Sequence, residues 1–247
     1  PAVCRAALTG AEMLQVVIDH GAPVDGKTSD GRSALMSAVA NGKTDAARLL
    51  LERGADVNAV DDRQSQTALH DAAMHGNVEI VELLIEHGAK VDAKTKGGIT
   101  PLVYAAVASS ADEGSMQKIA DMLIAGGAKL DITTAAGLGR AEDVAKFIAE
   151  NPKSVNEAVG MLKPLHVATY RGRLEVATLL LDAGADVNDT SGMGDAHTTT
   201  PLMCAATGGH LEVMRLLVQR GAKVDAAGEG GRTALHVAAA SKEPAIV

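Results

Sequence analysis

Short runs of apolar residues recur along the whole chain with a period of about 33 residues. The clearest example is Thr67 to Val91, TALHDAAMHGNVEIVELLIEHGAKV, in which Gly76 separates two runs with helical spacing. Thr67 is expected to cap the first helix with its hydroxyl group. In the second run, from Val78 to Glu86, only glutamates interrupt the apolar positions, and they fall on one narrow stripe. A helix with so little polar surface must be covered on nearly all sides, so the pattern predicts that similar helix pairs stack against it.

Three further segments follow the same pattern. They begin at Ser33, Lys163 and Thr200, and in all four copies the first residue lies 21 positions before the glycine of a Gly-Ala pair. Thr67 and Thr200 are each followed by an equivalent threonine 33 residues later. This period, together with local matches to T-P-L-H-x-A, resembles the ankyrin repeat. The best local matches begin at Thr67, Thr100, Lys163, Thr200 and Thr233.

The resemblance covers essentially the whole chain and implies an all-α fold. We expect one ankyrin-repeat solenoid of stacked helix-turn-helix units with projecting β-turns, spanning residues 1–247. The array should hold about eight repeats, the first and last incomplete, and we expect it to continue in further repeats on at least one side. The approximate ranges are 1–27 (partial), 28–62, 63–95, 96–130, 131–161 (irregular), 162–198, 199–230 and 231–247 (truncated).

Two neighbouring repeats depart from the pattern. Thr100 to Gly127 is six residues longer than the standard 21, and the extra residues, around 108–118, are rich in serine and glycine. They predict an extended loop between the two helices, or helix extensions around one. The next first helix follows Gly127 almost at once, so the projecting turn is missing from 131–161, and Phe147 is expected to fill the core there. These two features predict unfolding in two blocks.

Composition and charge mainly exclude classes of function. Aromatic residues make up 1% of the chain and its net charge is −8, which argues against a nucleic-acid partner. No apolar run is long enough to span a membrane. Cys4 and Cys204 lie six repeats apart, too far for an intrachain disulfide. We therefore expect a monomer in the cytoplasm, with no nucleic-acid or membrane partner.

The histidines do not form a catalytic or metal site in the sequence pattern. Six of the eight occupy framework positions of the repeat, and the resemblance assigns the signature histidine to structural hydrogen bonds. His75 and His197 remain, but they come from well-separated repeats, and no pair has the spacing of a zinc site. The sequence thus predicts no enzyme and no catalytic, metal or cofactor site. The framework histidines are His20, His70, His87, His166, His210 and His236.

The resemblance implies a protein-interaction scaffold that binds a partner protein or peptide on its concave face. One alternative is a regulatory or targeting segment of a larger enzyme or channel. Another is an enzyme whose site is shaped by the loop at 108–118. In the family, turn-tip residues and the two residues after the paired alanines line the concave face. Carried over, these positions are Arg32, Ala40, Asn41, Arg63, Gln64, Gln66, Met74, His75, Lys96, Ile99, Val107, Ala108, Tyr170, Arg171, His197, Thr199, Thr207 and Arg232.

Five of these positions carry cations, whereas the acidic residues lie mostly on second helices. This segregation predicts a mildly basic concave stripe, suited to an acidic peptide or protein surface. The alternative is that the long cations only solvate exposed turns. Tyr170 and Arg171 are the strongest single candidates, because tyrosine and arginine often anchor interfaces. The five cations are Arg32, Arg63, Lys96, Arg171 and Arg232.

Overall fold

The computed structural model describes residues 2–108, 112–160, 162–190 and 199–240, and these residues are mainly helical. Within them, β structure is limited to the isolated bridges between Lys27 and Ser33 and between Val159 and Leu162. Two short 3-10 segments, η1 (Pro152–Asn156) and η2 (Glu229–Gly231), accompany the α-helices. The α-helices are α1 (Ala2–Thr9), α2 (Ala11–Asp19), α3 (Ala34–Ala40), α4 (Thr44–Glu52), α5 (Ala68–His75), α6 (Val78–Glu86), α7 (Pro101–Val107), α8 (Glu113–Ala125), α9 (Ile132–Leu138), α10 (Ala141–Glu150), α11 (Pro164–Tyr170), α12 (Leu174–Asp182), α13 (Pro201–Gly208), α14 (Leu211–Gln219) and α15 (Ala234–Ala240).

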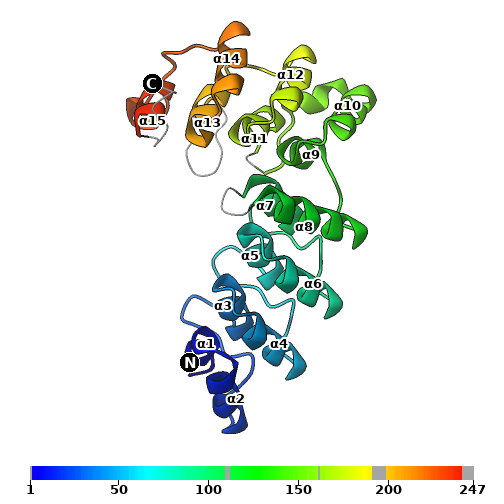
Figure 1. Ribbon diagram of the computed structural model, residues 1–247, viewed down its shortest axis with the longest axis vertical. Coiled ribbons are helices and arrows are strands. Elements are labelled where there is room, and N and C mark those ends of the chain that lie inside the picture. The colour runs from blue at the N-terminus through cyan, green and yellow to red at the C-terminus, as the bar shows by residue number, and fades with distance from the viewer. Residues whose placement is uncertain (1, 109–111, 161, 191–198, 241–247) are drawn as a thin grey trace. The chain divides into compact units, whose positions relative to one another are not determined.

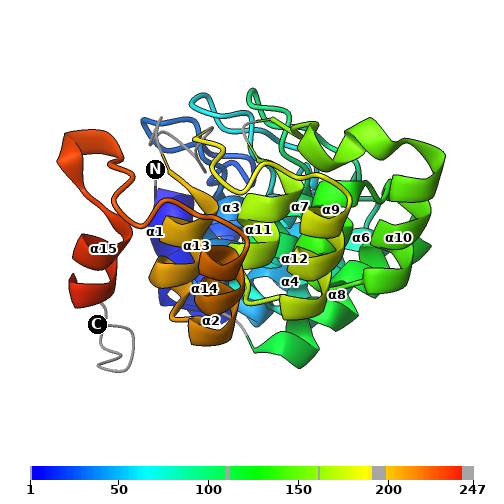
Figure 2. The ribbon, with the colours of Figure 1, turned by 90° about the horizontal axis from the view of Figure 1, so that it is seen from above.

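The chain forms two compact blocks, an N-terminal block of residues 1–129 and a C-terminal block of residues 130–247. In the N-terminal block, the first helices α1, α3, α5 and α7 contact one another in sequence, and α2, α4, α6 and α8 form a second row (Figure 1). Its turns project beyond the helix ends (Figure 2). In the C-terminal block, α9, α11, α13 and α15 form the first row and α10, α12 and α14 the second. The predicted all-α class of stacked helix pairs is confirmed.

Apolar side chains from both rows make up the core of each block. In the pair α5 and α6, Leu69, Ile80 and Leu84 are completely buried, whereas the glutamates of the predicted polar stripe are exposed. In the C-terminal block, Leu165 and Leu180 belong to one buried cluster, and Phe147 packs against that cluster while partly buried. The narrow polar stripe read from the sequence therefore marks the solvent side of the second helices.

Polar side chains at the helix starts satisfy backbone groups that a helix leaves unpaired. Ser33, Thr100 and Thr200 accept a hydrogen bond from the backbone N–H three residues later, and Asp131 does the same for α9. These residues therefore act as N-caps.

His70 combines the cap of α5 with a bond to the next repeat. The Thr67 N–H donates to His70 Nδ1 at 3.1 Å, and the Thr67 hydroxyl lies 2.8 Å from the same nitrogen. Because Nδ1 accepts, Nε2 carries the proton and donates to the carbonyl of Ile99 at 3.2 Å. His166 likewise places Nε2 2.9 Å from the carbonyl of Thr199. The predicted structural role of the signature histidines is confirmed at these two positions.

A ladder of Asn and Asp side chains connects successive outgoing turns. The Asn58 amide donates to the Gly88 carbonyl at 3.1 Å, and its oxygen accepts from the Lys90 N–H at 2.8 Å. Asn188 forms the same two bonds in the C-terminal block. At the equivalent position, Asp25 only accepts, from the Asp56 N–H at 2.9 Å. Asparagine therefore makes two bonds at each step, whereas aspartate makes one.

The irregular segments differ in part from expectation. The insertion around 108–118 was expected to form an extended loop or helix extensions around one. In its described part, Gly114 and Ser115 lie in the first turn of α8, which has 13 residues where α4 and α6 have 9, as the second alternative requires. Asp112 caps α8 by accepting from the Ser115 N–H at 2.9 Å. The aspartate cap stabilises a helical start for these two residues. Residues 109–111 of the insertion lie outside the described residues.

The segment 1–27, expected to be a partial repeat, has both helices. The boundary between the blocks falls where the sequence lacks a projecting turn.

The ladder predicts opposite effects for two exchanges of Asn and Asp. Asp25→Asn should add a hydrogen bond to the Gly54 carbonyl, raising the free energy of unfolding by about 0.5–1 kcal/mol. Asn58→Asp should lower it by a similar amount, because the carboxylate cannot donate to Gly88. Denaturant unfolding of both variants checks this. Shifts in the same direction would contradict the ladder.

The buried histidines predict that stability depends on pH. Burial lowers the pKa of His70, His166 and His210 from the ordinary value of about 6.5. Below that pH the unfolded chain binds protons that the folded state excludes, so the stability present above about pH 6.5 is lost as the pH falls. Unfolding at pH 7 and pH 5 should show this loss. Replacing His70 and His166 by Gln should make the loss smaller, and an unchanged loss would show that other groups cause it.

Candidate functional site

The residues expected to contact a partner lie on or next to the first helices. We call this surface, made of the first helices, the residue that follows each of them and the turns that precede them, the first-helix face. His197 lies outside the described residues. In the N-terminal block the face carries Arg32, Ala40, Asn41, Arg63, Gln64, Gln66, Met74, His75, Lys96, Ile99, Val107 and Ala108. In the C-terminal block it carries Tyr170, Arg171, Thr199, Thr207 and Arg232.

Only some of these side chains are accessible to solvent. Arg32, Gln66, Tyr170 and Arg171 are half-buried, which limits their contribution as contacts. Ala108 is buried, and its small side chain belongs to the core. The exposed members of the set are Asn41, Arg63, Gln64, His75, Lys96, Thr207 and Arg232.

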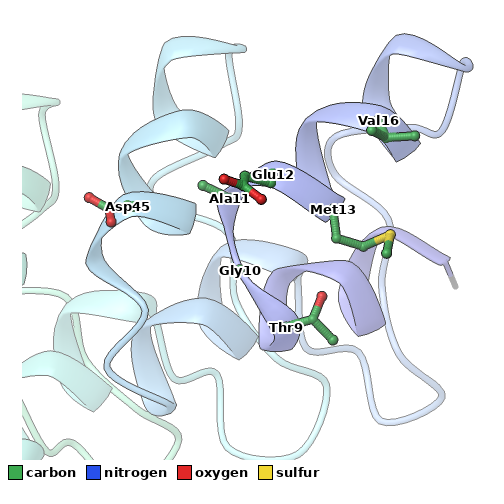
Figure 3. A pocket seen from close by; sticks show the side chains of 7 residues that line it. All are labelled: Thr9, Gly10, Ala11, Glu12, Met13, Val16 and Asp45. Atoms are coloured by element: carbon green, nitrogen blue, oxygen red, sulfur yellow. The ribbon is translucent and has the colours of Figure 1, made fainter.

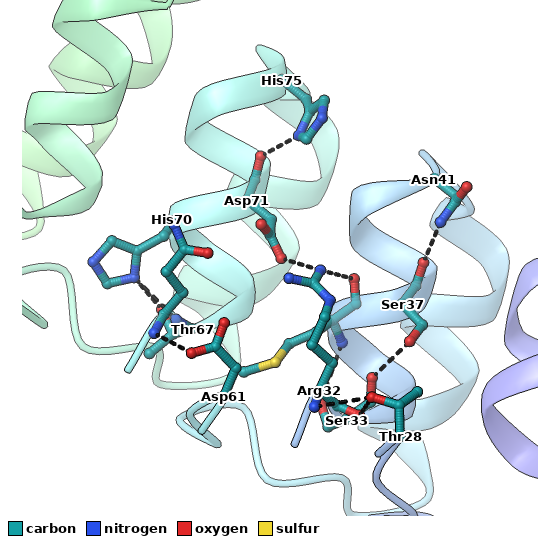
Figure 4. A network of polar contacts seen from close by, with 12 residues as sticks. Thr28, Arg32, Ser33, Ser37, Asn41, Asp61, Thr67, His70, Asp71 and His75 are labelled. Carbon is teal, nitrogen blue, oxygen red and sulfur yellow. Dashed lines mark hydrogen bonds and ion pairs between the residues drawn. The ribbon is translucent and has the colours of Figure 1, made fainter. Parts of the chain in front are cut away.

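Arg32 is neutralised by a buried carboxylate of the next repeat. Its Nη2 donates to Asp71 Oδ2 at 2.7 Å and to the Met36 carbonyl at 3.3 Å (Figure 4). The Asp71 side chain is only 5% exposed. Burial raises the pKa of Asp71, and the nearby Arg32 charge opposes that rise. The expected basic stripe therefore gains no uncompensated charge from Arg32.

Gln66 and Tyr104 form a second pair between neighbouring repeats. Gln66 Nε2 donates to Tyr104 Oη at 2.5 Å, and the Tyr104 ring meets the His70 ring edge-on, with centroids 5.8 Å apart. Burial raises the pKa of the Tyr104 hydroxyl. In each pair, the residue before one first helix bonds to a side chain on the next first helix. Sequence reasoning missed Asp71 and Tyr104, although a polar residue at the fifth position of the signature was a visible signal.

Asn41 and His75 are each held by one polar atom (Figure 4). Asn41 donates from Nδ2 to the Ser37 carbonyl at 2.9 Å, and His75 Nδ1 lies 2.8 Å from the Asp71 carbonyl. Within the described residues, no hydrogen bond involves Asn41 Oδ1 or His75 Nε2. Both side chains are therefore oriented by the helix and retain a polar atom for a ligand.

Lys96 and Arg63 supply the exposed positive charge of the face in the N-terminal block. Lys96 Nζ donates to the backbone carbonyls of Asp62 and Arg63 at 2.7 and 2.8 Å, which orient the ammonium without neutralising it. Arg63 Nη2 forms a long ion pair with Asp30 Oδ2 at 3.8 Å, beyond hydrogen-bond distance, and the Arg63 side chain stays 75% exposed. A hydrogen bond from the Thr28 hydroxyl is the main reason that the pKa of Asp30 is lowered.

A hollow of about 710 Å³ lies elsewhere in the N-terminal block (Figure 3). It is lined by residues 9–13, Val16 and Asp45, and includes none of the residues predicted to bind a partner. Its ionisable lining groups are the carboxylates of Glu12 and Asp45, and the Thr9 hydroxyl also lines it.

Other reactive groups are dispersed or buried. Burial raises the pKa of Cys204 to about 12 and is the main cause of the raised pKa of Cys4. Among the described residues, no cluster of three or more His, Cys, Asp or Glu side chains could hold a metal ion. None of the helices in the described ranges combines the length and hydrophobicity needed to cross a membrane.

Comparisons with known proteins identify the repeat. A family profile described as ankyrin repeats in many copies matches residues 37–85 and 69–112, a three-copy ankyrin profile matches 190–247, and a single-repeat profile matches 163–191. No curated protein sequence matches the chain. The crystal structure of the human ASB11 ankyrin repeat domain is similar, with 26% identity and a TM-score of 0.52 over 99% of this chain and 94% of that one. These profiles describe the same repeat, and together they match more than half of the residues of the chain. The chain therefore belongs to the ankyrin-repeat family.

Proposed function

We propose that this protein is a scaffold that binds another protein or a peptide through the first-helix face. Ankyrin repeats are generally protein–protein interaction modules, and repeat arrays offer extended surfaces for binding. One observation carries the proposal. Some polar side chains of this face are buried and hydrogen-bonded to the framework, whereas others are exposed to solvent. Side chains such as His70 are buried in the framework, whereas Asn41 and His75 each retain an unbonded polar atom within the described residues.

The orientation of these side chains favours binding. Holding a side chain in one place before the ligand arrives reduces the entropy lost on binding. Asn41 and His75 are anchored to helix carbonyls, and Lys96 is anchored to turn carbonyls. A ligand that crosses α3, α5 and the turn before α7 would meet an amide oxygen, an imidazole nitrogen and an ammonium group. This set fits a polar peptide or protein surface.

The proposed partner is acidic, but fewer positive side chains are available to attract it than the sequence alone indicates. Arg32 is compensated by Asp71, so the attraction in the N-terminal block depends on Arg63 and Lys96. Charges at the rim of an interface mainly change association rates and salt dependence. The proposal also applies where the ligand is another segment of the same polypeptide, as in a regulatory part of a larger enzyme or channel. The monomeric state and cytoplasmic location remain predictions.

Reversing three charges tests the proposal. The variant carrying Arg63→Glu, Lys96→Glu and Arg171→Glu should bind a partner isolated with the wild-type chain at least about tenfold more weakly. The remaining binding should depend less on salt, because fewer favourable charge pairs are screened. Affinity would be measured with the purified partner at two salt concentrations, and circular dichroism would confirm that the variant folds.

A matched control changes the same charges on second helices. Arg48→Glu, Lys146→Glu and Arg215→Glu alter exposed residues whose ion pairs with nearby carboxylates are worth little. This control should bind as the wild type does. Equal loss in both variants would indicate a general charge effect, and loss in the control alone would place the partner on the second helices.

A further inference from the structure

Ser65 adopts a backbone conformation that other repeats assign to glycine. Its φ is 57°, and it is the sole non-glycine residue in the described ranges with a positive φ. The equivalent positions, three residues before the first residue of a first helix, are Gly31, Gly98 and Gly231, with φ of 79°, 78° and 73°. A left-handed backbone is unfavourable for a residue with a Cβ atom. Serine at this position therefore costs stability that glycine would not.

The turn that contains Ser65 is also longer than its neighbours. Asp61 N–H donates to the Gln66 carbonyl at 3.0 Å, so this backbone bond spans five positions. The corresponding bonds from Thr28 to Arg32 and from Thr95 to Ile99 span four. The additional residue enlarges the tip of the turn from Asp61 to Gln66.

Several hydrogen bonds hold this enlarged turn in place. Oδ1 of the buried Asp61 accepts from the N–H groups of Gln64 and Gln66 at 2.9 and 3.2 Å. Lys96 adds its two ammonium bonds, and its own N–H donates to the Gln64 carbonyl at 2.8 Å. The backbone of the tip is therefore already ordered, which lowers the entropy lost when a ligand binds.

The side chains at the tip, in contrast, make few contacts with the rest of the fold. The Arg63 side chain is 75% exposed, and its Nη2 forms a long ion pair with Asp30 Oδ2 at 3.8 Å, which is worth little at such exposure. Within the described part of the chain, the Gln64 side-chain amide and the Ser65 hydroxyl have no hydrogen bond. A guanidinium, an amide and a hydroxyl group therefore lie on three consecutive residues of a rigid turn. Each of these groups can donate a hydrogen bond to a carboxylate.

We infer that Arg63, Gln64 and Ser65 form an anchor point for an Asp or Glu side chain of the bound protein segment. Arg63 supplies the charge and a planar pair of donors, and Ser65 and Gln64 supply neutral donors. The strain at Ser65 is then the consequence of placing a hydroxyl where stability favours glycine, as is common at binding sites. This inference rests on the proposed function and adds the contact point and the chemistry of the ligand.

The test uses the whole chain and labelled hexaglutamate, with hexaserine and hexalysine as control probes. Wild type should bind hexaglutamate more tightly than either control. Arg63→Gln should weaken that binding at least about fivefold, because it removes a charge-assisted pair. Ser65→Gly should weaken it about threefold while raising the unfolding midpoint by about 2–4 °C. Ser65→Ala should weaken binding without that rise, because alanine keeps the strain and loses the hydroxyl. Arg48→Gln, on a second helix, is the matched charge control.

The outcomes separate this inference from the proposed function. Hexaglutamate binding that is unchanged in Ser65→Gly and Ser65→Ala would overturn the role of Ser65. Absence of preference for hexaglutamate would overturn the carboxylate anchor. If the isolated partner binds normally to Arg63→Gln but poorly to the triple charge-reversal variant, the anchor is wrong and the first-helix face still binds. If both variants bind normally, both proposals fail.

Discussion

Every helix pair in this protein depends on its neighbours to cover its apolar side chains. In α6, Ile80, Val81 and Leu84 are completely buried, although the helix is only 9 residues long. Such a short helix is marginal in water by itself, so its stability comes from the helices packed against it. The hydrogen bonds from His70 to Ile99 and from Asn58 to Gly88 join the same neighbours through polar groups. The framework is therefore a chain of local contacts, each between one repeat and the next.

This constraint leaves the first-helix face free to vary. Residues that face a neighbour are confined to apolar side chains and a few polar groups with fixed partners. Asn41 and His75 face no such demand, because Asn41 Oδ1 and His75 Nε2 make no hydrogen bond within the described residues. Arg63 is joined to the preceding repeat through its side chain only by a long, exposed ion pair with Asp30. Recognition can then change without loss of the fold. The pair formed by Arg32 and Asp71 does both: it joins two neighbouring repeats, and it removes an uncompensated positive charge from the first-helix face.

The local part of the fold could be predicted from the sequence, and the contacts between repeats could not. Caps such as Ser33 and Thr100 and the buried positions of α6 follow from spacing within one repeat. The pairs of Arg32 with Asp71 and of Gln66 with Tyr104 join residues 39 and 38 positions apart, and depend on how one repeat sits on the next. The position of the predicted site residues on the first-helix face also follows from the repeat. The sequence does not show which of these residues are exposed, because exposure depends on the contacts between repeats.

Each repeat is stable only when it packs against folded neighbours, and hydrogen exchange in Leu84→Ala tests this dependence most directly. Leu84 is completely buried in α6, and removing its side chain should destabilise that helix by about 2–5 kcal/mol. If each repeat depends on its neighbours, amide protection should fall in α3, α4, α7 and α8 as well as in α5 and α6. Loss of protection confined to α5 and α6 would show that each helix pair is stable by itself, and would contradict the account.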